Sequence, residues 1–203
     1  MQGIITRFCA ICSASHTVAA LTALEQALGI EPSQRVHTLR GLLLLGGTIK
    51  SHALHVFALA LPDFPGFDSV LSMASSFPTE VTFALRLKQL GNRVQELIGG
   101  RAVHPVNPLV GGFGRLPRHR ELEALRSELA ASLDPLLRFV ELAATIPVPE
   151  WAAQPTVYVA LRPYEEWWLG WPPALCRRGC GSWKGVRTPC ACPNCGRARK
   201  RCG

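Results

Sequence analysis

The stretch between Pro32 and Pro62 constrains the fold most, because its residues are predicted to form one long helix. Pro32 and Ser33 start this helix, and Pro62 stops it because proline cannot continue the hydrogen-bond ladder. Gly46 and Gly47 fall in its interior, where each costs up to ~1 kcal/mol relative to alanine. The glycine pair therefore indicates close packing against a neighbouring element, or a kink.

Residues 39–61 of this helix are strongly apolar, so a membrane span has to be considered. The stretch nevertheless contains Arg40, Lys50, His52 and His55. Each charge near the centre of a bilayer costs roughly 2.5–3.5 kcal/mol. A buried amphipathic helix fits this pattern better, and no membrane partner is expected.

Apolar periodicity and Gly or Pro punctuation predict three further helices, over residues 13–28, 79–98 and 118–144. Ser13 or Ser15 is expected to cap the first of them, and Gly29 to end it. Residues 65–78 and 103–117 are predicted to be loops, and the alternating run 156–161 a strand. The expected fold class is mainly α, with long antiparallel helices, a small β element and an irregular cysteine-rich tail.

Charge and cysteine content divide the chain into a body and a tail. The net charge is +8, but residues 171–203 hold eight of the 22 basic residues and no acid. The rest of the chain carries 14 basic and 14 acidic residues, so the basic character belongs to the tail. The body has two cysteines, Cys9 and Cys12, and the tail has six.

The segment Arg7-Phe-Cys-Ala-Ile-Cys-Ser-Ala-Ser-His16 has the residues for metal chemistry. Cys9 and Cys12 can point both sulfurs at one metal, and the start of the following helix favours thiolate over thiol. His16 returns to the same helix face one turn after Cys12. Arg7 can offer fixed positive charge to an anionic centre, and thiolates suit nickel, iron and zinc.

The C-x-x-C spacing alone leaves other interpretations open. Two buried free cysteines would show it, and so would a thioredoxin-like redox pair, which needs a preceding strand that is not predicted here. The chain opens without a secretory signal, so a reducing, cytoplasmic location is expected. Metal or redox roles then outrank disulfides.

The whole segment resembles the cysteine motif R-x-C-G-x-C-x-x-x-H of nickel–iron hydrogenase large subunits. The match holds at Arg7, Cys9, Cys12 and His16 and departs at Ala10, where the family has glycine. The resemblance continues through residues 17–25, 40–63 with Ser-His-Ala-Leu-His at 51–55, and 99–105, and covers roughly residues 1–166. Residues 54–63 resemble most closely the soluble NAD(P)-linked hydrogenase or sulfhydrogenase branch of the family.

This resemblance implies an oxidoreductase that catalyses reversible oxidation of H2. Cys9 would be a terminal nickel ligand, Cys12 would bridge nickel and iron, and His16 would hydrogen-bond near the bridging sulfur. The iron would carry cyanide and carbon monoxide. Electrons would pass to an iron–sulfur small subunit and diaphorase-type subunits.

Two departures from the family lead to the expectation of a central fragment that lacks both ends and is inactive alone. The family supplies a glutamate upstream of its motif, whereas six residues precede Arg7 here. The family also has a second motif, Asp-Pro-Cys-x-x-Cys, whose cysteines complete the four thiolates. Asp134-Pro135 is followed by Leu136, so this motif does not occur in these 203 residues.

Two further pairs of residues, each with at least one histidine, have alternative roles. Arg101 and His104 follow a glycine pair and are expected either in a surface turn or, by resemblance, in the shell near the metal. His52 and His55 lie three residues apart and could bind a metal, but a core or interface role is favoured.

The tail gives the alternative function. Its cysteines Cys176, Cys180, Cys192 and Cys195 have spacings similar to a zinc ribbon, which could hold zinc and, with the basic charge, bind nucleic acid without being an enzyme. The loss of family likeness near Glu166 and the abrupt change in composition favour out-of-frame or disordered sequence instead. The expected division is a partial large-subunit domain over 1–166 and a tail over 167–203, and nucleic-acid binding is not favoured.

Overall fold

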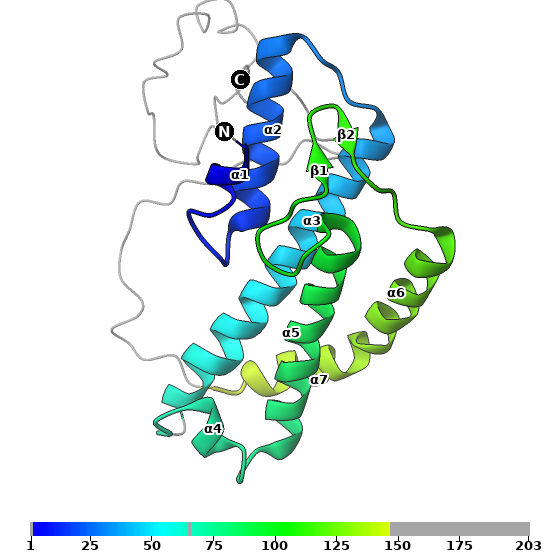
Figure 1. Cartoon of the computed structure of the whole chain (residues 1–203). Helices are drawn as coiled ribbons and strands as arrows, with labels where there is room; N and C mark the ends of the chain where they lie inside the picture. The colour runs from blue at the N-terminus through cyan, green and yellow to red at the C-terminus, as the bar shows by residue number, and fades with distance from the viewer. Residues whose placement is uncertain (1, 65, 147–203) are drawn as a thin grey trace, which may run out of the picture. The chain divides into compact units, whose positions relative to one another are not determined.

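The computed structural model describes residues 2–64 and 66–146, which fall in one structural unit spanning residues 1–152. This part is mainly helical with one small hairpin, as Figure 1 shows, which confirms the predicted fold class. The elements in chain order are α1 (Gln2–Ile5), α2 (Ser13–Leu28), α3 (Gln34–Ala53), α4 (Val70–Met73), α5 (Pro78–Gly99), β1 (Pro108–Leu109), β2 (Gly112–Phe113), α6 (His119–Ala131) and α7 (Leu133–Ala143). Helix α3 continues as a π-helical segment, Leu54–Ala60, and a 3-10 turn, Leu61–Asp63.

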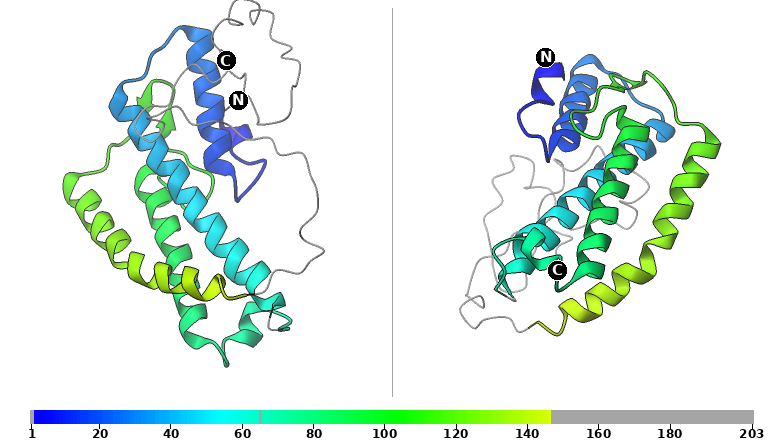
Figure 2. Two further views of the ribbon diagram at one scale, coloured as in Figure 1. Left: turned by 180° about the vertical axis from the view of Figure 1, so that it is seen from behind. Right: turned by 60° about the horizontal axis from the view of Figure 1, so that its bottom comes forward.

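Helices α3 and α5 run antiparallel and form the centre of this unit (Figures 1 and 2). A Cβ atom at Gly46 would lie 2.7 Å from the Cβ of Val94, and one at Gly91 would lie 2.6 Å from the backbone nitrogen of Lys50. Both distances are too short for a real contact, so the two backbones meet only because the glycines lack side chains. The glycine pair of α3 therefore marks close packing, as predicted.

The core spreads from this crossing to α2 and α6. Its buried members are Ala14, Val18, Leu39, Leu43, Leu90, Val94, Ile98 and Leu125. Figure 2 shows α6 and α7 following the α3–α5 pair on one side, while α2 lies at the end where α3 begins. The apolar stripe of α6 reaches the core mainly through Leu125, which is 4% exposed.

The segment Gln34–Asp63, which is α3 and its continuation, is apolar and long enough to cross a membrane. It is the one such helix among residues 2–64 and 66–146, with a mean hydropathy of 1.4 over its most apolar window, and 33% of that window is buried. A core helix passes the same test of length and composition. Its buried residues Leu39 and Leu43 belong to the core cluster, so α3 packs as a core helix within this unit.

A buried ion pair joins α2, α3 and the hairpin. The Arg40 guanidinium donates hydrogen bonds of 2.7 and 2.5 Å to the two Glu25 carboxylate oxygens. Arg40 also donates to the backbone oxygen of Leu109, and the backbone N–H of Gly111 donates to Glu25 Oε1 at 2.6 Å. The pair therefore holds the β1–β2 turn against both helices.

Several elements differ from the sequence predictions. Helix α4 and the β1–β2 hairpin lie in segments predicted as loops, and α1 lies where no element was predicted. Ser69 caps α4 through a reciprocal pair of hydrogen bonds with Ser72. The predicted helix 118–144 is broken at Ser132, because Pro135 has no N–H to donate to the carbonyl of Ala131. The strand predicted at 156–161 lies outside the described residues.

The glycine crossing predicts a sharp difference between two substitutions. Gly91→Ala should lower the free energy of unfolding by about 1–3 kcal/mol, because the added methyl meets the backbone of α3. Gly41→Ala, in the partner helix α3, is the control, because nothing lies within 4 Å of its Cβ position, and it should raise the free energy of unfolding by up to ~1 kcal/mol. Urea unfolding of both variants measures this, and equal effects would contradict the crossing.

The buried ion pair predicts a pH-dependent stability. Burial raises the pKa of Glu25, but hydrogen bonds from Arg40 and the Gly111 amide outweigh it, so the pKa lies below its ordinary value of 4.5. The stabilisation is then present above pH 4.5 and lost as the pH falls through the lowered pKa. Glu25→Gln should lower the free energy of unfolding by about 3–5 kcal/mol at neutral pH. The stability of this variant should also change less as the pH falls below 4.5.

A second substitution controls for loss of charge alone. Glu128 pairs with Arg93 at 2.8 Å, but their side chains are 39% and 56% exposed. Glu128→Gln should therefore change stability by at most about 1 kcal/mol. Unfolding curves of both variants between pH 7 and pH 3 test the pair, and a Glu25→Gln curve that overlays the wild type would refute its role.

Candidate metal site at the start of helix α2

The loop between α1 and α2 carries both cysteines of the body. Cys12 is the N-cap residue of α2, so the prediction that Ser13 or Ser15 caps this helix is wrong. Ser13 is the first helical residue and is fully buried, with its hydroxyl directed to the carbonyl of Ala10 at 3.3 Å. The N-cap amide is satisfied by sulfur instead, because the Cys12 N–H donates to Cys9 Sγ at 3.3 Å.

The structure brings Cys9, Cys12 and His16 together. Cys12 Sγ lies 3.3 Å from His16 Nε2, one helical turn later, while the backbone N–H of His16 donates to the Cys12 carbonyl. Both thiols are free, with Cys9 half-buried and Cys12 exposed. Two soft sulfur donors and one imidazole thus share a surface that an ion or another protein segment can reach.

The two thiols differ in acidity. Hydrogen bonds from the Cys12 side chain and backbone hold the pKa of Cys9 below its ordinary value. The hydrogen bond to Cys9 and partial burial raise the pKa of Cys12. The start of α2 therefore favours a thiolate at Cys9, as expected for such a position, and disfavours a second one at Cys12 while the pair is free.

His104 ties the cysteine loop to the segment after α5. Its Nδ1 lies 2.6 Å from the Thr6 carbonyl oxygen, and its backbone N–H donates to Ser13 Oγ at 3.2 Å. The residue has a φ of +56°, which L side chains rarely adopt. One strained residue thus contacts both ends of the loop, so His104 lies beside the cysteines rather than in an isolated surface turn.

Arg7 and Arg101 make no hydrogen bond to the sulfur of Cys9 or Cys12. They line a shallow cavity of about 250 Å³ together with His104 and Pro105. Within residues 2–64 and 66–146, the Arg7 guanidinium makes no hydrogen bond or ion pair. The charge role predicted for Arg7 is therefore not supported by a contact to either sulfur.

Lys50 was missed by the sequence analysis. Its side chain is buried at 6% exposure, and Nζ donates to the Ala102 carbonyl at 3.0 Å. Burial and the positive charge of Lys88 lower the pKa of Lys50, electrostatic attraction to Cys9 raises it, and the net direction is downward. The available signal was its spacing, since Lys50 follows Gly46 and Gly47 by one helical turn and so shares their packed face.

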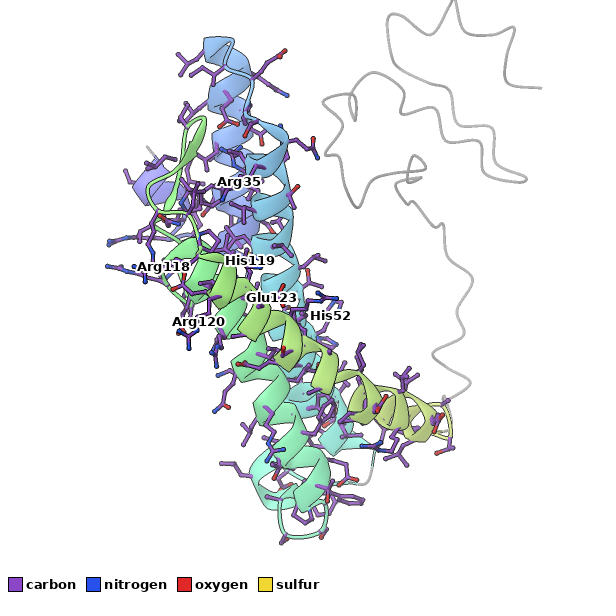
Figure 3. All side chains as sticks on the ribbon, turned by 90° about the vertical axis from the view of Figure 1, so that its right-hand side faces the viewer. Arg35, His52, Arg118, His119, Arg120 and Glu123 are labelled. Atoms are coloured by element: carbon purple, nitrogen blue, oxygen red, sulfur yellow. The ribbon has the colours of Figure 1, made fainter. Side chains whose placement is uncertain are left out.

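The other histidines of α3 are outside this cluster. His52 and His55 are exposed, and Figure 3 shows His52 projecting outward from α3, so a core role for them is wrong. In the part of the chain that the structure describes, no group of three or more His, Cys, Asp or Glu side chains is placed to hold a metal. Cys176, Cys180, Cys192 and Cys195 lie outside that part.

Comparison with known proteins gives the family. The model of the nickel-dependent hydrogenase family matches residues 1–83. Sulfhydrogenase 1 subunit alpha of Pyrococcus furiosus is 39% identical over 161 residues, which is 79% of this chain and 37% of that protein. Sulfhydrogenase 2 subunit alpha of the same organism is 47% identical over 119 residues, 59% of this chain and 29% of that protein.

A solved structure agrees with the sequence matches. The fold is similar to an NAD+-reducing [NiFe]-hydrogenase in the H2-reduced state, with a TM-score of 0.63 and 26% identity over 69% of this chain and 34% of that one. The chain thus spans about a third of the length of the proteins it matches. From the cysteine loop, the helical fold and these matches, the chain belongs to the nickel-dependent hydrogenases, as a segment of the large subunit.

Proposed function

We propose that this chain supplies Cys9 and Cys12 to the nickel–iron centre of a hydrogenase that oxidises H2 reversibly. In this proposal Cys9 would hold nickel as a terminal ligand, and Cys12 would be a ligand of both nickel and iron. The observation that carries it is the geometry at the start of α2, where two free thiols lie side by side with Cys12 open to solvent. Sulfhydrogenase and NAD+-reducing relatives support the soluble, NAD(P)-linked branch.

The donor set fits half of such a centre. Thiolates are the preferred protein ligands for soft transition metals, and the loop holds two of them. Among the described residues no group of three or more His, Cys, Asp or Glu side chains is placed to close a metal site by itself. The remaining two thiolates would come from the part of a large subunit beyond the matched third. When bound, the centre would supply heterolytic cleavage of H2 between metal and base, with cyanide and carbon monoxide on the iron.

The residues around the sulfurs would orient the ligands. His16 can hold a proton on Nε2, 3.3 Å from Cys12 Sγ, and so direct a hydrogen bond to the bridging sulfur. His104 fixes the loop by its contacts to Thr6 and Ser13, which keeps both sulfurs in place. Such outer contacts set ligand orientation in metal sites generally.

Exposed apolar side chains indicate that the site is covered in a larger assembly. Phe8 and Ile11 of the cysteine loop are 74% and 49% exposed, and Ile4 of α1 is 68% exposed. Apolar groups gathered around a functional loop mark a contact surface. We infer that the rest of the large subunit, an iron–sulfur small subunit and diaphorase-type subunits complete the enzyme, and the cytoplasmic location stays a prediction.

The zinc-ribbon alternative depends on cysteines outside the described residues. The matches to hydrogenase subunits favour the nickel–iron site over it. Zinc binding by the tail stays a prediction, and it can coexist with the site at the start of α2. Any metal measurement therefore has to remove the tail cysteines first.

The proposal predicts weak metal binding without catalysis in these 203 residues alone. A variant with all six tail cysteines changed to serine should bind Ni²⁺ weakly at Cys9 and Cys12, because two thiolates leave positions open to water. Nickel titration followed by the thiolate charge-transfer absorption measures this. Adding Cys12→Ser should abolish the absorption, while Ser15→Ala, a neighbouring control in α2, should leave it unchanged.

The same preparation should show no hydrogen-dependent dye reduction, because two of four thiolates are missing. Activity that disappears with Cys12→Ser would show that these residues complete the centre by other ligands. Absence of any absorption sensitive to Cys12→Ser would reject the assignment of the cysteine pair as a metal site.

A further inference from the structure

The cavity lined by Arg7 and Arg101 is built from three separate segments of the chain. Arg7 comes from the loop after α1, and Leu109 comes from β1. Arg101 and His104 belong to the segment that follows α5. The volume is about 250 Å³, below the roughly 300–1,000 Å³ of pockets that bind drug-sized molecules. An occupant of this cavity is therefore small.

Hydrogen bonds fix the walls of the cavity before any ligand binds. The Gly99 carbonyl accepts from the backbone N–H groups of Val106 and Asn107 at 2.9 and 3.0 Å, so the residues between them form a closed turn. His104 ties this turn to the loop after α1, because its Nδ1 lies 2.6 Å from the Thr6 carbonyl oxygen. A carbonyl oxygen only accepts, so Nδ1 carries a hydrogen in this contact. The two segments that carry the arginines are therefore held together.

The charge around the cavity has one sign. All lining residues lie within residues 1–24 and 97–120, which contain five arginines and no Asp or Glu. Glu25, the next residue after the first of these stretches, is buried and paired with Arg40. Arg7 and Arg101 form no ion pair within the part of the chain that the structure describes. Two cations at one cavity without a neighbouring acid favour an anion there.

Much of the remaining lining is apolar. Pro105 is buried, whereas Val106 and Leu109 are 54% and 46% exposed. Removing apolar surface from water is favourable by about 25 cal/mol per Å². A bare inorganic ion would leave the Val106 and Leu109 side chains in water, whereas an anion with a short aliphatic stem would cover them.

We propose that this cavity binds a carboxylate on a short aliphatic stem, carried by a free short-chain acid or by an Asp or Glu side chain of another protein. The Arg7 and Arg101 guanidinium groups donate to its oxygens, because their planar fork matches the two oxygens of a carboxylate. Val106 and Leu109 cover the stem. Neither cysteine takes part, so this site goes beyond the proposed function and does not depend on it.

Isovalerate is the probe for a free acid, and two relatives separate its contacts. Acetate keeps the carboxylate without the branched stem, and isovaleramide keeps the stem without the charge. Each is titrated into the full chain under reducing conditions, and backbone amide shifts in two-dimensional NMR spectra give the affinity. The amides of Arg101, His104 and Val106 report on the cavity, so binding to the basic tail is not counted.

Isovalerate should shift these amides saturably and bind at least about tenfold more tightly than isovaleramide. Arg7→Gln and Arg101→Gln should each weaken isovalerate binding roughly tenfold, the low end for hydrogen bonds to charged groups, because both arginines are exposed. Leu109→Ala should reduce the preference for isovalerate over acetate and leave acetate binding unchanged.

Arg86→Gln is the matched control for loss of one charge. Arg86 is an exposed arginine of α5 that does not line the cavity, so its variant should stay within about twofold of the parent. Thermal unfolding of each variant checks the fold. If one arginine variant does not fold, the comparison of isovalerate with isovaleramide on the parent and on the other variant decides.

Two peptides identify the source of the carboxylate. Acetyl-Leu-Glu-Leu-amide and its Gln counterpart are titrated in the same way. Tighter binding of the Glu peptide than of isovalerate assigns the cavity to a side chain of another protein, and the reverse order assigns it to a free acid. Equal binding of isovalerate and isovaleramide, or full affinity in both arginine variants, would overturn the carboxylate site and would leave the proposed metal site untouched.

Discussion

The close crossing of α3 and α5 is the contact on which the rest of this unit depends. Gly46 and Gly91 bring the two backbones together where any side chain would force them apart. The same crossing places Leu43 and Ile98, both fully buried, in the centre of the core. Because the two helices are fixed at this point, the segment after α5 has a fixed position beside α2. There His104 contacts Thr6 and Ser13, at the two ends of the cysteine loop.

A buried polar side chain without a hydrogen-bond partner lies near this crossing. Gln95 is fully buried, and neither its amide oxygen nor its amide nitrogen has a hydrogen-bond partner within the described part of the chain. It approaches Gly47 at the junction of α2, α3 and α5, the turn of α3 that precedes Lys50. An unpaired buried amide costs about 1–3 kcal/mol, so Gln95 at this junction is unfavourable for stability alone. Local exceptions of this kind are expected beside functional sites.

The sequence predicted the long helices well because their limits are set by local chemistry. Gly29 and Gly100 end α2 and α5 in the left-handed conformation, and Pro32 lies just before the start of α3, so these limits come from backbone effects that act within a few residues. The break at Ser132 also had a local cause, the missing N–H of Pro135, which the leucine periodicity obscured. The β1–β2 hairpin had none, since it is held by Arg40 and Glu25, about 70 and 85 residues away in the chain.

The candidate site also has one part that the sequence alone could indicate and one part that it could not. The spacing of Cys9, Cys12 and His16 places them on one turn, which the sequence alone could indicate. The spacing of Lys50 from Gly46 and Gly47 indicates that it shares their packed face, but its hydrogen bond to Ala102 depends on the fold of residues 101–104, which the sequence alone does not indicate.

The geometry of the loop also bears on how a metal would be received. A left-handed residue such as His104 costs about 1–3 kcal/mol, and here two hydrogen bonds to Thr6 and Ser13 offset that cost. The strain is thus maintained by contacts to both sides of the cysteine loop. A loop held in this way loses little conformational entropy when its sulfurs take up a ligand, because the backbone is ordered before binding. In the proposed metal site, this loop would therefore be a preorganised half, with its open side bounded by the exposed apolar residues Phe8 and Ile11.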